Sequence, residues 1–279
     1  MNLTGRTALF GVVGHPVSHS RSPPMQIAAF DACGIDAVYV ALPVPPDRLA
    51  DALRGAHALG FQGLNVTVPH KEHAVAACLS LDPVAAEIGA VNTLRRTAEG
   101  WEGFNTDAPA CRALLEAAGV ARGARGLVVG AGGAARAAAW ALLRAGVHLR
   151  IAARRVESAD ALARDAARWP RDPRLTAEAV PFSALPLEAD AADVVVNATP
   201  IGLTADQELP VKLRAEQVVV DFVYGETAFE LAAREAGAQL VSGEEILVRQ
   251  GALAFSIWTG RPAPEAAMAA AVRAGGKVT

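Results

Sequence analysis

The segment Leu127–Ala135 reads LVVGAGGAA, a strand-forming run that ends in a glycine-rich turn and opens into an alanine-rich helix. Glycine lets such a turn close tightly, and it lets backbone N–H groups approach a pyrophosphate. The N-terminus of the following helix adds partial positive charge at the same place. We therefore expect the turn to bind a dinucleotide, unless it is only a structural link between strand and helix. The turn consists of Gly130, Ala131, Gly132, Gly133 and Ala134.

The end of the next predicted strand, residues 147–152, favours NADP over NAD. An NAD site usually ends this strand with Asp or Glu, which accepts hydrogen bonds from the ribose hydroxyls. Here Ala153 is followed by Arg154 and Arg155, and the next carboxylate is Glu157. A guanidinium pairs with a 2′-phosphate, which a carboxylate would repel. The alternative is that the two arginines only solvate a surface loop.

Around this segment, short β-branched runs alternate with alanine-rich stretches, a pattern that predicts an α/β protein with mostly parallel sheets. Strands are expected at residues 8–13, 37–41, 63–66, 90–94, 102–105, 126–129, 147–152, 194–197 and 218–222. Helices are expected at residues 23–33, 47–59, 71–78, 107–118, 134–145, 158–167, 228–236, 244–259 and 263–274. We expect the last two helices to pack back on the first domain.

Composition excludes several classes of protein. The chain has 279 residues, of which 52% are apolar and 20% charged, so it can bury a real core. Its net charge of −3 argues against nucleic-acid binding. Apolar runs fall short of the roughly 20 residues that a membrane helix needs. Three widely spaced cysteines suit core positions in a reducing compartment, so cytoplasm is the expected location. No metal site is expected.

The segment Gly14–Pro23 follows the first predicted strand and carries two serines that could bind an anion. Ser22 can cap a helix whose first residue is Pro23. Ser20 and Ser22 would then hold a substrate carboxylate at the N-terminus of that helix. The alternative is that Ser22 is only a helix cap.

The segment Asn65–Lys71 runs from a strand end to the beginning of the predicted helix 71–78. Asn65 and Thr67 are compact hydrogen-bonding groups that suit a polyol ligand. Lys71 is unusual because a cation is disfavoured in the first turn of a helix. A lysine held in this way could pass a proton to a carbonyl oxygen. The alternative is an ordinary surface lysine.

Two later segments supply further polar candidates. Asn92 lies in GAVNT at residues 89–93, and Asp107 ends NTD at residues 105–107. Asp107 stands where a strand gives way to a helix, so it could simply cap that helix. Its other possible role is to pair with Lys71 and contact a substrate hydroxyl.

Taken in order, these segments resemble the shikimate dehydrogenase family over almost the whole chain. The resemblance rests on HSRSP at 19–23, NVTVPHK at 65–71, GAVNT at 89–93, NTD at 105–107, GAGGAAR at 130–136, NATPIG at 197–202, DFVY at 221–224 and LVRQGA at 247–252. The chain departs from the family pattern at Gly243–Ile246, which reads GEEI, and at Ala153-Arg154-Arg155.

The resemblance implies a two-domain α/β enzyme that reduces 3-dehydroshikimate to shikimate with NADPH. Residues 1–107 with 241–279 would bind the substrate, and residues 108–240 would form a Rossmann-like NADP domain. Lys71 and Asp107 would be the catalytic pair. The substrate-binding residues would be Ser20, Ser22, Asn65, Thr67, Asn92, Tyr224 and Gln250. The cofactor would also contact Asn197, Ala198, Thr199 and Gly243.

A paralogous dehydrogenase acting on quinate or a related alicyclic acid is the alternative, and a non-catalytic sensor on the same scaffold is a second one. The expected partners are small molecules alone, with neither nucleic acid nor membrane, and the expected state is a monomer or homodimer. The presence of both Lys71 and Asp107 favours an enzyme, because binding alone does not need the pair.

Overall fold

A computed structural model describes residues 3–169, 172–202 and 209–275 of the chain. The chain folds as two compact units. The first combines Met1–Thr106 with Leu247–Thr279, and the second is Asp107–Ile246. Among the described helices, none has the length and apolar character needed to cross a membrane.

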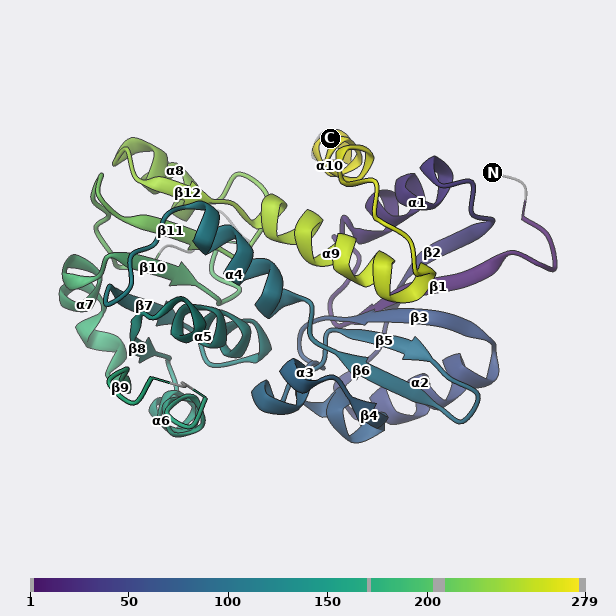
Figure 1. The fold of residues 1–279 in the computed structure, drawn as a ribbon, viewed down its shortest axis with the longest axis horizontal. Helices are drawn as coiled ribbons and strands as arrows, with labels where there is room; N and C mark the ends of the chain where they lie inside the picture. Colours follow the sequence, from purple (N-terminus) through teal and green to yellow (C-terminus); the bar gives the residue numbers. More distant parts are fainter. Residues whose placement is uncertain (1–2, 170–171, 203–208, 276–279) are drawn as a thin grey trace. The chain divides into compact units, whose positions relative to one another are not determined.

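The first unit contains a six-stranded sheet in the order β2-β1-β3-β5-β6-β4 (Figure 1). Its strands are β1 (Ala8–Gly14), β2 (Ala37–Pro43), β3 (Phe61–Val66), β4 (Cys78–Leu81), β5 (Thr93–Arg96) and β6 (Trp101–Phe104). β1 runs parallel to both β2 and β3, whereas β5 is antiparallel to β3 and β6. The sheet is therefore mixed, and it departs at β5 from the parallel arrangement that the sequence predicts.

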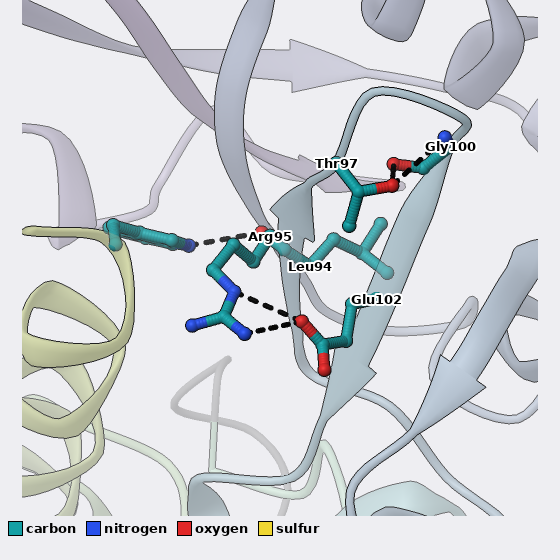
Figure 2. Close-up of polar contacts among 6 residues, drawn as sticks. Leu94, Arg95, Thr97, Gly100 and Glu102 are labelled. Atoms are coloured by element: carbon teal, nitrogen blue, oxygen red, sulfur yellow. Dashed lines mark hydrogen bonds and ion pairs between the residues drawn. The ribbon is translucent and has the colours of Figure 1, made fainter.

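The antiparallel pairing follows from the short connection between β5 and β6, because parallel neighbours need a crossover of a dozen or more residues. Figure 2 shows this hairpin. Arg95 donates from Nε to Glu102 Oε2 at 3.0 Å across the two strands, and Gly100 donates its N–H to the Thr97 hydroxyl at 3.1 Å. The Trp258 indole N–H donates to the Leu94 carbonyl at 3.0 Å, which fixes β5 to α9.

Helices cover both faces of this sheet. One face carries α1 (Ser22–Ala32) and the late helices α9 (Gly243–Thr259) and α10 (Glu265–Gly275). The aromatic rings of Phe10, Phe30 and Trp258 stack there, with centroids 4.9 and 5.2 Å from that of Phe10. The other face carries α2 (Leu49–Ala58), α3 (Pro83–Ile88) and the 3₁₀ segments η1 (Pro46–Arg48) and η2 (His73–Ala77). The predicted packing of the late helices on the first domain is confirmed.

Two local predictions in this unit are wrong. The expected helix at residues 71–78 is a turn at Lys71, the short 3₁₀ segment η2 and the beginning of β4. Lys71 therefore does not stand in the first turn of an α-helix. Ser22 is the first residue of α1 rather than its cap, and Arg21 occupies the cap position without a side-chain capping bond.

The second unit is a parallel six-stranded sheet in the order β12-β11-β10-β7-β8-β9. Its strands are β7 (Arg125–Val129), β8 (His148–Ala152), β9 (Ala177–Val180), β10 (Val194–Asn197), β11 (Val218–Asp221) and β12 (Gln239–Val241). Every strand pair is parallel. The strand order reverses between β7 and β10, the position at which doubly wound sheets bind nucleotides. The predicted α/β fold class is confirmed.

The helices of this unit lie on both faces of its sheet. α4 (Asp107–Ala117) packs against α5 (Gly133–Ala145), which packs against β7 and β8. α6 (Val156–Ala166) packs against β8 and β9. α7 (Leu185–Ala191), which follows the 3₁₀ segment η3 (Phe182–Ala184), and α8 (Ala228–Glu235) close a separate apolar cluster with the sheet.

Candidate active site

A buried polar cluster in the first unit brings together Asn92, Thr106 and Gln250, which lie far apart in the sequence. Asn92 donates from Nδ2 to the Thr106 hydroxyl at 2.9 Å and to Gln250 Oε1 at 3.4 Å. The Asn92 amide oxygen accepts the Thr106 backbone N–H at 2.7 Å. Asn92 and Gln250 are 2% and 8% exposed. These contacts fix the orientation of both predicted substrate-binding amides.

Asn65 is oriented by neighbours that the sequence reasoning did not identify. Its Oδ1 accepts the Tyr39 hydroxyl at 2.7 Å. Its Nδ2 donates to the Asn92 carbonyl at 3.2 Å and to the Thr93 hydroxyl at 3.0 Å. Tyr39 is therefore a positioning residue for Asn65. The available signal was its place in the predicted strand 37–41, because a tyrosine that a strand buries needs a partner for its hydroxyl.

Thr67 and Lys71 lie on the loop that leaves β3. The Thr67 N–H donates to the Val13 carbonyl at 2.9 Å, which holds this loop beside the end of β1. The Lys71 carbonyl accepts the Val91 N–H at 2.8 Å. Lys71 is half-buried. Its backbone is thus held directly beside the residue that precedes Asn92.

Asp107 directly follows the last residue of the first unit, Thr106. Asn92 binds the backbone of Thr106, as described above, and Asp107 is the next residue and the first of α4. Asp107 is only 5% exposed. Within the first unit, backbone and amide hydrogen bonds consequently link the segments that carry Lys71 and Asn92 to Thr106, the residue before Asp107.

The two candidate serines lie at the beginning of α1. The Ser22 N–H donates to the Ser20 hydroxyl oxygen at 3.2 Å, so this loop folds back on itself. Ser22 is buried and Ser20 is half-buried. The first turn of α1 has no side-chain cap, but its backbone donors are already used: Pro23 and Pro24 have no N–H, and the Met25 N–H donates to the Arg21 carbonyl at 3.3 Å. Side-chain hydroxyl groups, rather than helix N–H groups, are therefore the donors that this segment offers to an anion.

The glycine turn of the second unit has the geometry that a dinucleotide needs. Gly130 has φ +123°, and a Cβ there would lie 2.7 Å from the Ala198 carbonyl oxygen. Only glycine fits this position, because both the backbone angle and the close approach exclude a side chain. α5 begins at Gly133 with Gly132 as an uncapped N-cap residue, so its N–H groups face the turn.

Arg154 and Arg155 follow β8 at the same edge of the sheet. The Gly130 N–H donates to the Ala152 carbonyl at 2.8 Å, which places the glycine turn beside the end of this strand. Both arginines are exposed, and neither forms an ion pair with the residues that the structure describes. Exposed guanidinium groups beside a glycine turn, with alanine in place of the usual acid, fit a 2′-phosphate.

The turn after β10 completes this edge. The Ala198 N–H donates to the Val129 carbonyl at 2.9 Å. The Asn197 side-chain oxygen accepts the Thr199 N–H at 3.1 Å and the Thr199 hydroxyl at 2.7 Å. The predicted cofactor residues Asn197, Ala198 and Thr199 therefore lie next to Gly130, at the point where the strand order reverses.

The beginning of α9 adjoins the loop after β11. A Cβ on Gly243 would lie 2.2 Å from the Val223 carbonyl oxygen and 2.8 Å from the Tyr224 nitrogen. Glu245, which departs from the family pattern, accepts the Ser242 N–H at 2.8 Å, and the Glu245 N–H donates to the Ser242 hydroxyl at 3.3 Å. This reciprocal capping box gives Glu245 a structural role at the start of the helix.

The described ranges contain neither a metal-binding cluster nor a buried cysteine with a lowered thiol pKa. No group of three or more His, Cys, Asp or Glu side chains there could hold a metal ion. Burial raises the pKa of the Cys111 thiol to about 12 and that of Cys78 to about 11, so both remain protonated near neutral pH. These thiols are therefore poor nucleophiles.

Comparisons with known proteins identify relatives along the whole chain. Residues 12–94 match the model of the shikimate dehydrogenase substrate binding domain, and residues 243–273 match that of the shikimate 5′-dehydrogenase C-terminal domain. The shikimate dehydrogenase (NADP(+)) of Anaeromyxobacter sp. (strain K) is 66% identical over 274 residues, which cover 98% of each chain.

Solved structures agree with these sequence matches. Shikimate 5-dehydrogenase from Thermus thermophilus, in complex with NADP(H) and shikimate, is 36% identical with a TM-score of 0.83. The match covers 96% of this chain and 99% of that one. Quinate dehydrogenase from Corynebacterium glutamicum in complex with NAD is 31% identical with a TM-score of 0.85. That match covers 96% of this chain and 99% of the quinate dehydrogenase chain.

Proposed function

The chain belongs to the shikimate dehydrogenase family, and we infer that it is an NADP-dependent oxidoreductase that interconverts 3-dehydroshikimate and shikimate in aromatic amino-acid biosynthesis. The 66% identity over nearly the whole chain carries this assignment to shikimate rather than quinate, since the quinate dehydrogenase is 31% identical. The exposed Arg154 and Arg155 beside the glycine turn support NADP.

We assign cofactor binding to the carboxyl edge of the second sheet. NADPH supplies the hydride when bound. Gly130 shapes the turn, the N–H groups of residues 131–134 at the N-terminus of α5 bind the pyrophosphate, and the two arginines bind the 2′-phosphate. The backbone of Asn197, Ala198, Thr199 and Gly243 contacts the remainder of the cofactor.

Substrate binding is assigned to the polar groups of the first unit. Ser20 and Ser22 hold the carboxylate at the uncapped end of α1. The ring hydroxyls are held by Asn65, Thr67, Asn92 and Gln250. Tyr224 contacts the substrate from the loop after β11. The hydrogen bonds that fix Asn65, Asn92 and Gln250 support this assignment, because a fixed amide recognises a hydroxyl at low entropic cost.

Proton transfer is assigned to Lys71 with Asp107. During reduction, the Lys71 ammonium donates a proton to the ketone oxygen as the carbonyl carbon becomes a secondary alcohol. The Asp107 carboxylate holds the ammonium and the adjacent hydroxyl in line. In the reverse direction, neutral Lys71 accepts the hydroxyl proton. The hydrogen-bonded segments that carry the two residues support the pairing, and such general acid–base assistance is worth roughly 10²–10⁴ in rate.

The proposal extends to the organisation of the chain. Residues 1–107 with 241–279 form the substrate-binding catalytic domain, and residues 108–240 form the NADP-binding domain. We propose a cytoplasmic monomer or homodimer without a nucleic-acid or membrane partner. Size-exclusion chromatography with light scattering distinguishes these two states from a larger assembly.

The activity is tested by absorbance at 340 nm with shikimate or quinate and with NADP or NAD. We expect the shikimate–NADP combination to have the highest kcat/KM. A higher kcat/KM with quinate than with shikimate would instead identify the chain as a quinate dehydrogenase. Lys71→Met should lower kcat by roughly 10²–10⁴ with little change in KM, because its proton is needed in the transition state.

The exposed Lys212 is a control for the loss of a lysine, and Lys212→Met should keep wild-type kinetics. Asp107→Asn combined with Lys71→Met should cost little more than Lys71→Met alone, because the two groups act as a unit. Fully additive losses would contradict the paired role.

A further inference from the structure

Two carboxyl groups of the second unit are buried beside the proposed cofactor edge and have no role in the proton transfer described above. Asp221 ends β11 with 0% of its surface exposed, and Glu230 on α8 is 4% exposed. Thr227 links them: its hydroxyl donates to Asp221 Oδ2 at 2.7 Å and accepts the Glu230 N–H at 3.0 Å. A buried carboxylate normally needs compensation, so the pair requires a physical explanation.

Asp221 has the environment of an ionised carboxylate. It accepts from the Thr227 hydroxyl, from Asn197 Nδ2 at 3.0 Å and from the Val223 N–H at 3.0 Å. All three partners are donors, which suits an acceptor-only group. Burial nevertheless raises the pKa of Asp221 to about 6, while these hydrogen bonds act in the opposite direction.

Glu230 is less well compensated than Asp221. Its Oε1 is buried and has no hydrogen-bond partner in the described part of the chain. Burial and then the charge of Asp221 raise the pKa of Glu230 to about 7. Glu244 of α9 raises it further, whereas the Gly243 backbone and Arg234, whose Nη2 is 3.8 Å from Oε2, lower it.

Asp221 controls the turn after β10 through one amide. Because it accepts from Asn197 Nδ2, the Asn197 oxygen must face the other way, toward Thr199. The same Nδ2 also donates to the Ile201 carbonyl at 3.0 Å. The path of residues 198–201 therefore depends on the Asn197 orientation that Asp221 sets.

Glu230 adjoins a second part of the same edge. The Gly243 backbone hydrogen-bonds to its carboxyl group, and Gly243 packs against Val223 and Tyr224. The two acids thus connect the turn after β10, the loop after β11 and the beginning of α9. Ionising both would place two negative charges in one buried site, which favours separation of these segments.

We propose that Asp221 and Glu230 are positioning residues that together carry a single proton, with Glu230 protonated and Asp221 charged. This singly protonated state sets the conformation of the loops at the cofactor edge. The proposal rests on the assignment of NADP to that edge. Loss of the shared proton loosens the Asn197–Thr199 turn and weakens cofactor binding. The two groups titrate as a pair.

The test measures NADPH binding by its fluorescence between pH 5.5 and 8.5 in wild type, Glu230→Gln and Glu235→Gln. Glu235 is exposed on the same helix, so its substitution makes the same chemical change, carboxyl to amide, without touching the pair. The 2′-phosphate titrates equally in all three proteins. We expect the NADPH dissociation constant of Glu235→Gln to follow that of wild type at every pH. The dissociation constant of Glu230→Gln should rise less with pH, so that at pH 8.5 it is lower than that of wild type by roughly fivefold or more.

Equal pH dependence in all three proteins would overturn the positioning role while leaving the cofactor site intact. Absence of NADPH binding to wild type at every pH would instead remove the site and this inference with it. Carboxyl ¹³C NMR of the wild type decides the matter if Glu230→Gln does not fold. One carboxyl group titrating between pH 6 and 8 supports the shared proton, and titration of all carboxyl groups below pH 5 refutes it.

Discussion

Glu230→Gln should stabilise the second unit at alkaline pH and change its stability little below pH 5. Glutamine keeps the shape of the side chain but cannot ionise, so it avoids the cost of burying a charge beside Asp221. Because the folded state raises the pKa of Glu230 from 4.5 to about 7, the native protein binds this proton more tightly than the unfolded chain. The stability that it contributes is therefore fully present below pH 4.5 and is lost as the pH rises through 7.

The magnitude follows from the same two values. A difference of about 2.5 pH units corresponds to an upper bound of about 3.5 kcal/mol, at about 1.4 kcal/mol for each unit. Local relaxation and water entry reduce such penalties, so we expect about 1–2 kcal/mol. The gain of Glu230→Gln over wild type should reach this value at pH 8 and should be near zero at pH 5.

Urea unfolding at pH 5, 6, 7 and 8 measures this difference, with hydrogen exchange of peptides from α8 and β11 to assign it to the second unit. Glu235→Gln is the matched control and should be within about 0.5 kcal/mol of wild type throughout. If Glu230→Gln lowered stability equally at pH 5 and pH 8, the reasoning from charge burial would be refuted, because that result would describe a packing defect.

Three further perturbations test the site. Arg154→Ala should weaken NADP by roughly tenfold, the loss of one charged hydrogen bond, while NAD binding measured by the same titration stays nearly constant; equal losses would exclude a 2′-phosphate contact. Tyr39→Phe should raise the KM for shikimate and cost about 1–3 kcal/mol of stability, because the buried Asn65 oxygen loses its donor; steady-state kinetics and urea unfolding give both values, and an unchanged KM would limit Tyr39 to a role in stability. Gly243→Ala should lower stability by about 1–3 kcal/mol, because the new methyl group overlaps the Val223 carbonyl; a wild-type melting temperature would contradict this packing.

The first unit shows where local sequence patterns failed. Residues 71–78 have the alanine content of a helix, yet β4 pairs with β6 from Cys78 onward, and only the short η2 segment fits between Lys71 and that strand. Long-range pairing overrode local propensity here. The antiparallel position of β5 was likewise invisible in a pattern of short strands and helices.

The sequence alone determined the glycine turn, the parallel sheet of the second unit and the preference for NADP, because each depends on residues that are close together in the chain. A tight turn needs glycine wherever it occurs, and two arginines after a strand need no distant partner to attract a phosphate. The ordered motifs also specified the family.

Only the tertiary structure decided how the side-chain amides of Asn65, Asn92 and Gln250 are oriented. It also decided which buried carboxyl groups lack hydrogen-bond partners. Nothing near Asn65 in the chain predicts that Tyr39 binds its oxygen, and nothing in the segment that carries Asp221 and Glu230 predicts that the packed fold buries both carboxyl groups. Hydrogen-bond direction and charge burial depend on groups that folding brings together from distant segments. Those properties therefore belong to the packed molecule, and a linear motif does not contain them.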